Sequence, residues 1–399
     1  MTTLRAQRPA SRHQLDWLTD ELIHWQSVGW VDPDHADEIL RSYRPTHRLS
    51  LSRLVLTLGA GFLGVGLIWL VAANLDSLPP LLRFAAVAAF WLLATAAAEW
   101  LASRREHAGT VPSPVVGAAR IVASLAFGAV VFQAAQSLQV PAYEPKLVGF
   151  WACGVLLLGY ATRATSTLLI GLALGTGWFV WQVVWSSPDG LAVVLAFLVA
   201  GVVAVGIATL HGRWSPDFTA PWREVGALLV LVGLFAAAIP DIGGGDDFEW
   251  SPALVVGLAT AALLSVAGVA AGEGRARLEP LAAAVLTVAG AGLVLWDPPN
   301  DPDALTAGDV SHAVVAVVLY VGVTVLVAVL GVVHDSWRLT AMSTVALVLF
   351  TTVQSFAVFA RIIDGAWLFL LLGVVFLLTG YGFDRARREL ASTLEGDAS

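Results

Sequence analysis

The chain has 399 residues, of which 57% are hydrophobic and only 13% are charged, with a mean hydropathy of +0.77 and a net charge of −8. Soluble domains average about 25% charged residues, so this composition excludes a water-soluble protein of this size. It indicates an integral membrane protein. Arginine supplies all the basic residues except Lys146, a bias that, together with abundant alanine and valine, is typical of GC-rich prokaryotic genomes.

Residues 1–50 are polar and predict a small cytosolic helical hairpin over residues 11–44. Apolar side chains recur at helical spacing over residues 15–25. Gly29 is expected to end this first helix, and Asp32 followed by proline is typical of a helix start. So short a unit cannot bury a large core alone. We therefore expect it to rest on the membrane, on the bundle, on a partner protein or on a second copy.

Long apolar runs separated by short polar segments follow residue 50. A helix needs about 20 mostly apolar residues to cross a bilayer. We therefore predict an all-α polytopic transmembrane bundle of about twelve spans within residues 51–385, followed by a cytosolic tail over residues 386–399. The predicted spans are residues 54–74, 81–101, 115–137, 146–162, 165–185, 190–210, 222–239, 251–271, 279–296, 310–333, 338–360 and 366–384.

The distribution of basic residues predicts the orientation of these spans. Eighteen basic residues fall on one side of the predicted membrane, and the other side holds three, Arg83, Lys146 and Arg361. Cytosolic loops are enriched in arginine and lysine, so both termini are predicted to lie in the cytosol, with the protein in the cell membrane. Tryptophans near the predicted span ends agree with this map, because indole rings favour the membrane interface.

Two of the predicted outer loops are acidic, over residues 246–249 and 297–309. One interpretation is a divalent-cation site on the outer face, and the other is ordinary solvated loop chemistry. The spacing of the carboxylates matches no EF-hand pattern, which favours the solvated loops. We therefore predict no metal site.

A charged pair is predicted near the cytosolic ends of the second and third spans. Glu99 ends the second span, and Arg120 lies about 8 Å into the third at a rise of 1.5 Å per residue. Charged side chains inside a bilayer are expensive and usually pair with one another. A structural ion pair between Glu99 and Arg120 is the first interpretation, and a substrate-contacting Arg120 is the alternative.

Amide side chains gather in the outer third of the outward-running spans. Gln133 and Gln136 share one face of the third span, while Asn74 ends the first span and is followed by Asp76 and Arg83 in the outer turn. Polar groups inside a bilayer are functional hypotheses by default. These five residues predict a ligand pocket open to the outside. The alternative is that the amides reach water or join neighbouring helices.

Enzyme chemistry finds no support in the sequence. It contains no HExxH, GxSxG, phosphate-loop or paired CxxC motif, and its one cysteine is Cys153. No predicted span carries an acidic residue near its centre, which argues against an ion-coupled pump. We expect no cofactor.

Three motifs occur together in the first third of the chain. The hairpin runs from Trp25 through Gly29 to Tyr43, the first span ends in the turn 72–79 followed by Arg83, and the third span carries Phe-Gly and then glutamine over residues 127–133. In these motifs residues 11–140 resemble an uncharacterised bacterial family of predicted polytopic membrane proteins. Leu75 stands where that family usually has tryptophan. The resemblance implies a membrane location and no known activity.

The sequence thus predicts a non-enzymatic protein that binds or moves a small polar or amphipathic ligand through the outward pocket. The alternative is a structural or sensory scaffold that recruits a partner through its cytosolic hairpin. The expected partners are the lipid bilayer, a lipid or small-molecule ligand, and a cytosolic protein or a second copy of the chain. No nucleic acid is expected.

Overall fold

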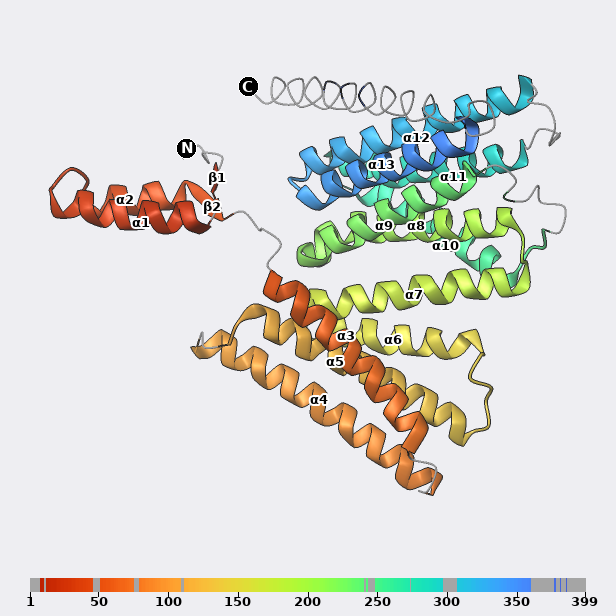
Figure 1. The fold of residues 1–399 in the computed structure, drawn as a ribbon, viewed down its shortest axis with the longest axis horizontal. Helices are drawn as coiled ribbons and strands as arrows, with labels where there is room; N and C mark the ends of the chain where they lie inside the picture. The colour runs from red at the N-terminus through yellow and green to blue at the C-terminus, as the bar shows by residue number, and fades with distance from the viewer. Residues whose placement is uncertain are drawn as a thin grey trace.

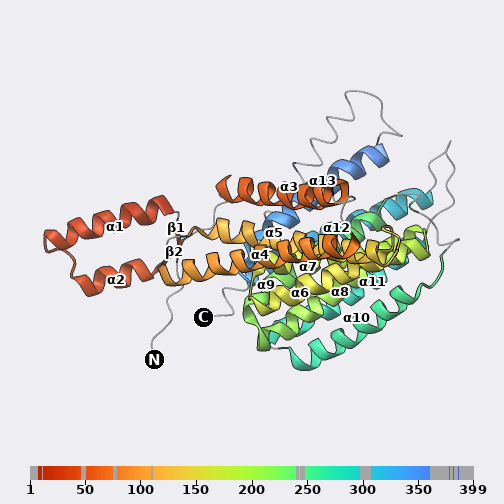
Figure 2. The ribbon, with the colours of Figure 1, turned by 90° about the horizontal axis from the view of Figure 1, so that it is seen from below.

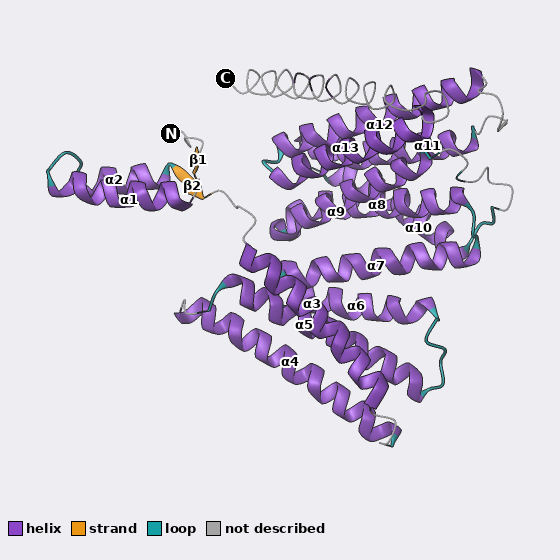
Figure 3. Cartoon of the chain, in the orientation of Figure 1, coloured by secondary structure: helices purple, strands orange, loops and turns teal. Residues whose placement is uncertain are grey.

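The structure is a computed structural model, and it describes most of the chain. Within the described residues it contains thirteen α-helices, one short 3-10 helix and two short strands, which confirms the predicted all-α class (Figure 3). The described residues are 8–10, 12–45, 51–74, 79–108, 111–239, 242, 248–272, 274–296 and 307–359, with the single positions 377, 381 and 385.

Helices α1 (Arg12–Ser27) and α2 (Pro33–Arg41) form a helical hairpin, which Figure 1 shows apart from the bundle. Asp32 caps α2, since its side chain accepts a hydrogen bond of 2.8 Å from the backbone N–H of His35. Gly29 has a φ of +77° in the connecting turn, a conformation that glycine adopts without strain. Leu22 and Ala36 are buried within the hairpin.

Two short strands, β1 (Arg8–Ala10) and β2 (Tyr43–Pro45), join the ends of the hairpin. They pair in parallel, with Arg8 opposite Tyr43. The sequence did not predict these strands, because three residues are too few to show an alternating pattern. Their pairing brings the two ends of the hairpin side by side.

Among the described residues, eleven helices joined mostly by short turns form the bundle (Figure 1). Proline occupies the first turn of many of them, where its missing N–H has no partner to lose. They are α3 (Leu51–Asn74), α4 (Pro80–Ala108), α5 (Ser113–Ser137), α6 (Pro145–Ala161), α7 (Thr165–Ser186), α8 (Gly190–Trp214), α9 (Pro216–Ala237), α10 (Pro252–Ala271), α11 (Glu279–Leu295), α12 (Ala307–Val333) and α13 (Trp337–Phe359), with the 3-10 helix η1 (Gly274–Leu278) before α11.

The predicted count of about twelve spans is wrong: in the described part of the chain, eight helices are long and apolar enough to cross a membrane. The predicted span 146–162 corresponds to α6, whose 17 residues fall short of about 20. The predicted span 54–74 lies in α3, a helix of 24 residues whose side chains are described only over Leu54–Gly66. The span 338–360 corresponds to α13, whose described part carries an arginine, a glutamine and several hydroxyl side chains and is not among the eight. The span 366–384 and the tail lie outside the described helices.

Helix α8 is the centre of the second half of the bundle, where it contacts α7, α9, α10 and α11. Its contact with α9 is close because glycines face each other: a Cβ added at Gly201 would lie 3.2 Å from the carbonyl oxygen of Gly226. Helix α7 also contacts α5 and α6, so it joins the first half to the second. Figure 2 shows α3 and α10 on opposite sides of this bundle.

Three aromatic rings attach α12 and α13 to α9. Tyr320 and Phe350 stack with their centroids 4.0 Å apart, and Phe235 meets both edge-on at 6.0 and 5.9 Å. Such arrangements are favourable because the ring edge and the ring face carry opposite partial charges. The contact fixes α12 beside α9, which builds one wall of the site described next.

Candidate functional site

A cavity of about 240 Å³ lies between α8, α9, α11 and α12. Each of these helices contributes apolar side chains to its wall, among them Val205, Val230, Leu286 and Val327. Apolar cavities of this kind exclude water and accept apolar groups. The wall therefore favours a hydrocarbon ligand.

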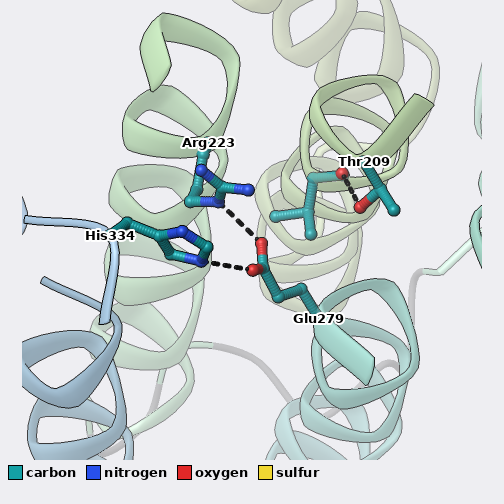
Figure 4. A network of polar contacts seen from close by, with 5 residues as sticks. Thr209, Arg223, Glu279 and His334 are labelled. Atoms are coloured by element: carbon teal, nitrogen blue, oxygen red, sulfur yellow. Dashed lines mark hydrogen bonds and ion pairs between the residues drawn. The ribbon is translucent and has the colours of Figure 1, made fainter. Parts of the chain in front are cut away.

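One end of this cavity carries a buried ionic group formed by Arg223, Glu279 and His334 (Figure 4). Nε of Arg223 donates to Oε2 of Glu279 at 2.7 Å, and Nε2 of His334 donates to Oε1 at 2.6 Å. Arg223 and Glu279 are each only 8% exposed. Because both oxygens of the carboxylate accept a hydrogen bond, the buried charge of Glu279 is satisfied.

Three different elements bring this ionic group together at one end of the bundle. Arg223 lies in the second turn of α9, Glu279 is the first residue of α11, and His334 follows the end of α12. From here the cavity reaches about 10 Å along α11 to Leu286 and about 16 Å along α12 to Val323, at 1.5 Å per residue. The site thus has a charged end and a long apolar body.

The cavity reaches the surface of the bundle, and η1, α11 and α12 supply most of its wall. Three of its lining residues are well exposed: Leu278 (57%), Leu326 (39%) and Val333 (41%). Both α11 and α12 are among the candidate membrane spans. A lining residue that is exposed within such a span, as Leu326 is, faces lipid.

A second ionic contact holds the turn between α12 and α13 beside this site. Oγ of Ser336 donates to one oxygen of Glu224, and Nη1 of Arg338 donates to the other, each at 3.0 Å. The adjacent residues Arg223 and Glu224 therefore bind two different elements. This contact fixes the position of His334, which lies in the same turn.

A chain of hydrogen bonds also joins α6, α8 and α9. Nε1 of Trp222 donates to the hydroxyl of Tyr160 at 2.8 Å, and that hydroxyl lies 2.9 Å from Nε2 of His211. Nδ1 of His211 lies 2.8 Å from the carbonyl oxygen of Ile207, which only accepts, so Nδ1 carries the proton and Nε2 accepts from Tyr160. The chain is satisfied throughout, and it positions the start of α9 just before Arg223.

The structure brings Glu99 and Arg120 together. Nε and Nη2 of Arg120 donate to the two oxygens of Glu99 at 2.8 and 2.7 Å, which is the two-pronged geometry of a strong arginine–carboxylate pair. Oγ of Ser124 donates to the backbone carbonyl of Arg120 at 2.7 Å. The pair joins α4 to α5 and lies far along the chain from the cavity.

The residues of the predicted outward pocket do not form one described group. Gln133 is buried, whereas Gln136, one turn later in α5, is exposed, and Arg83 is half-buried near the start of α4. The side chain of Asn74 and the whole of Asp76 lie outside the described residues. The outward pocket therefore stays a prediction.

The acidic outer loops fall largely outside the described residues, as residues 243–247 and 297–306 do. The backbone N–H of Glu249, which is described, donates to Oγ of Ser187 at 3.0 Å. No group of three or more histidine, cysteine or acidic side chains is placed to hold a metal ion within the described ranges.

The buried ionic group at the cavity was missed from the sequence. Arg223 and Glu279 lie near the ends of predicted spans, where charged residues are ordinary, and His334 lies alone in a short turn. The one indication in the sequence was that a glutamate, Glu279, begins an apolar run. Its partners are more than 50 positions away, so the sequence does not show that they meet.

Residues 24–168 match the model of a family described as "Predicted membrane protein (DUF2157)", which confirms the predicted resemblance. No curated protein and no solved structure matches the chain. The matched region runs from the end of α1 to the start of α7, and Val205, Arg223 and the other cavity residues follow it. The chain is thus a multi-pass membrane protein whose cavity lies outside the part that the family model covers.

Proposed function

We propose that this multi-pass membrane protein binds an amphipathic ligand that enters the cavity from the bilayer, and that it catalyses no reaction on it. The observation that carries the proposal is an apolar cavity that has exposed lining residues on the candidate span α12 and an ionic group at one end. The apolar wall suits a hydrocarbon chain, and the ionic end suits a polar head. The sequence predicted a small polar or amphipathic ligand in a different, outward-facing pocket.

The size of the cavity limits what it holds. Pockets for drug-sized ligands usually measure about 300–1,000 Å³, and this cavity measures about 240 Å³. A single hydrocarbon chain is the better match. The rest of a larger lipid would remain in the bilayer outside the opening.

The test is native mass spectrometry of the full chain released from nanodiscs, with and without a blocked cavity. Val329 lines the cavity on α12, and Val318 lies exposed on the same helix. We expect Val329→Phe to remove a co-purifying amphiphile that the wild type and Val318→Phe retain. Equal retention by all three proteins would reject the proposal.

We also propose that both termini lie in the cytosol of a cell whose plasma membrane holds the protein. The distribution of basic residues supports this orientation. It would place Arg223 and Glu279 at the cytosolic leaflet. A green fluorescent protein fused after Ser399 is then expected to fluoresce, and an alkaline phosphatase at the same position to stay inactive; the reverse pattern would contradict the orientation.

We also retain the outward pocket as a proposal for a second ligand contact, on the outer side of the membrane. Its residues are Asn74, Asp76, Arg83, Gln133 and Gln136. The burial of Gln133 supports it, because a buried amide requires hydrogen-bond partners. If the pocket contacts the ligand, Gln133→Leu should weaken ligand binding measured from the outer side of proteoliposomes. Unchanged binding would remove Gln133 from the proposed pocket.

A second candidate function is that of a scaffold that recruits a cytosolic partner or a second copy through the hairpin. The observation that favours it is the exposure of large apolar side chains there: Trp17, Ile23, Val28 and Trp30. A photo-reactive amino acid at Trp30 is expected to cross-link to another protein in cells, while one at the polar position Asp34 is not. Equal labelling at both positions would argue against this role.

A further inference from the structure

We propose that the polar head of the ligand is an oxyanion, such as a phosphate, received by Arg223 and Arg275, with one hydrocarbon chain in the cavity. This inference rests on the proposed function and names the class of ligand. It depends on which charged groups line the cavity, on the donors that Arg223 keeps, and on where Arg275 lies.

The ionisable groups that line the cavity favour a negative ligand. Among the described lining residues, two are arginines, one is a glutamate and one is a histidine. Both oxygens of Glu279 already accept hydrogen bonds, at 2.7 and 2.6 Å, so binding a cationic head there would break a buried ion pair. The carboxylate is therefore closed to a cationic head, whereas the two arginines of the lining have N–H donors suited to an anion.

Arg223 keeps donors for such an anion. A guanidinium group has five N–H donors, and the contact with Glu279 uses Nε. Arginine binds phosphate and carboxylate through paired parallel hydrogen bonds, which is geometry that a lysine cannot supply. The low exposure of Arg223 strengthens such a contact, because the attraction between charges is greater away from water.

Arg275 lies where the head of a lipid would be. It belongs to η1, between the end of α10 and the start of α11, and it lines the cavity together with Leu278 at the exposed rim. Span ends lie at the level of lipid head groups. A chain entering between α11 and α12 therefore brings its head to Arg275.

Arg277 provides a matched comparison within the same short helix. Its Nε donates to the carbonyl oxygen of Gly274 at 2.9 Å, and it is not among the residues that line the cavity. Both arginines are exposed and carry the same charge. If positive charge near the cavity acted only in a general way, both arginines would contribute to ligand binding. A head group bound at the cavity requires Arg275 alone of the two.

The experiment measures the affinity of the purified full chain in detergent for four probes. Palmitoyl lysophosphatidate has one chain and a phosphate, monopalmitoylglycerol has the same chain without the phosphate, palmitoyl lysophosphatidylcholine carries a zwitterionic head, and inorganic phosphate has no chain. We expect lysophosphatidate to bind at least about tenfold more tightly than the other three, since it alone combines the chain with a full oxyanion and charge-assisted hydrogen bonds are stronger than neutral ones. Arg275→Gln should lose most of that preference and leave the affinity for monopalmitoylglycerol unchanged, and Arg277→Gln should behave as the wild type.

Two results would overturn the oxyanion head while leaving the proposed function intact: equal affinities for the three chain-bearing probes, or equal losses in Arg275→Gln and Arg277→Gln. Inorganic phosphate binding as tightly as lysophosphatidate would overturn the amphipathic class and indicate a site for a free anion. Failure of the proposed function looks different, because Val329→Phe would then leave the binding of all the chain-bearing probes unchanged.

Discussion

Glu279 is the residue on which the charged end of the cavity depends. It is 8% exposed and accepts hydrogen bonds from Arg223 and His334, so it joins the start of α11 to α9 and to the turn after α12. Removing one partner of a buried ion pair leaves the other charge buried without compensation. A substitution of Glu279 should therefore lower the stability more than a substitution in an exposed ion pair does.

We expect Glu279→Gln to lower stability by about 3–5 kcal/mol, since it leaves Arg223 buried without a counter-charge. A lower midpoint of thermal unfolding in detergent would show this loss. Glu144→Gln is the control, because Glu144 pairs with the exposed Lys146 at 3.5 Å and such pairs are worth about 0–1 kcal/mol. Equal midpoints for the two variants would contradict the role given to Glu279.

The hairpin contains a pH-dependent contact between Asp32 and His35. The backbone hydrogen bond from His35 lowers the pKa of Asp32, and the side-chain hydrogen bond with Asp32 raises the pKa of His35. The contribution of Asp32 is lost as the pH falls through its lowered pKa, and that of His35 is lost as the pH rises through its raised pKa. The contact is therefore complete only between these two pKa values.

Asp32→Asn should return the pKa of His35 toward its ordinary value, because it removes the carboxylate that the imidazolium binds. Asparagine still caps a helix, so α2 should persist. An NMR titration of the histidine ring, assigned with a His35→Gln variant, measures the change. A pKa of His35 that is the same in both proteins would show that the contact does not form in solution.

At the scale of the elements, the close approach of α8 and α9 determines where Arg223 lies. A Cβ added at Gly226 would be 2.7 Å from Cγ2 of Val205, 3.0 Å from its backbone nitrogen and 3.1 Å from the carbonyl oxygen of Gly201. Two of these three atoms belong to the backbone and cannot move aside alone. Any side chain at Gly226 must therefore separate the two helices.

Gly226→Ala should destabilise the protein by about 1–3 kcal/mol, the usual cost of overfilling a packed contact. Gly177→Ala in α7 is the matched control, because an added Cβ there meets nothing within 4 Å and alanine favours a helix by about 0.5–1 kcal/mol. The thermal midpoint should fall in the first variant and stay level or rise in the second. A fall of equal size in both would mean that the close contact is not the cause.

At the scale of the whole molecule, hydropathy predicted the helical class and capping residues predicted local boundaries such as Asp32 before α2. Hydropathy did not predict the number of spans, because a short apolar run was counted as a full span: α6 has 17 residues, fewer than the about 20 that a bilayer requires. The pairing of Glu99 with Arg120 followed from one short connection between two helices. The ionic group at the cavity could not be predicted in this way. Its members come from α9, α11 and the turn after α12, and only tertiary packing brings these elements together.

The family match and the cavity occupy different halves of the bundle. The match covers residues 24–168, and the cavity lies between α8, α9, α11 and α12. Helix α7 and the hydrogen bond from Trp222 to Tyr160 connect the two halves. The cavity that the proposed ligand enters therefore belongs to the second half of the bundle.

Photo-labelling in nanodiscs tests whether the cavity holds a hydrocarbon chain. A palmitoyl lysophosphatidate with a diazirine in its chain is bound to the full protein, activated by light, and its adducts are mapped by peptide mass spectrometry. Occupancy of the cavity predicts adducts at lining positions such as Leu286 and Val323 that disappear in Val329→Phe and persist in Val318→Phe. Adducts confined to exposed positions such as Val288 and Val318, and unchanged in Val329→Phe, would contradict it.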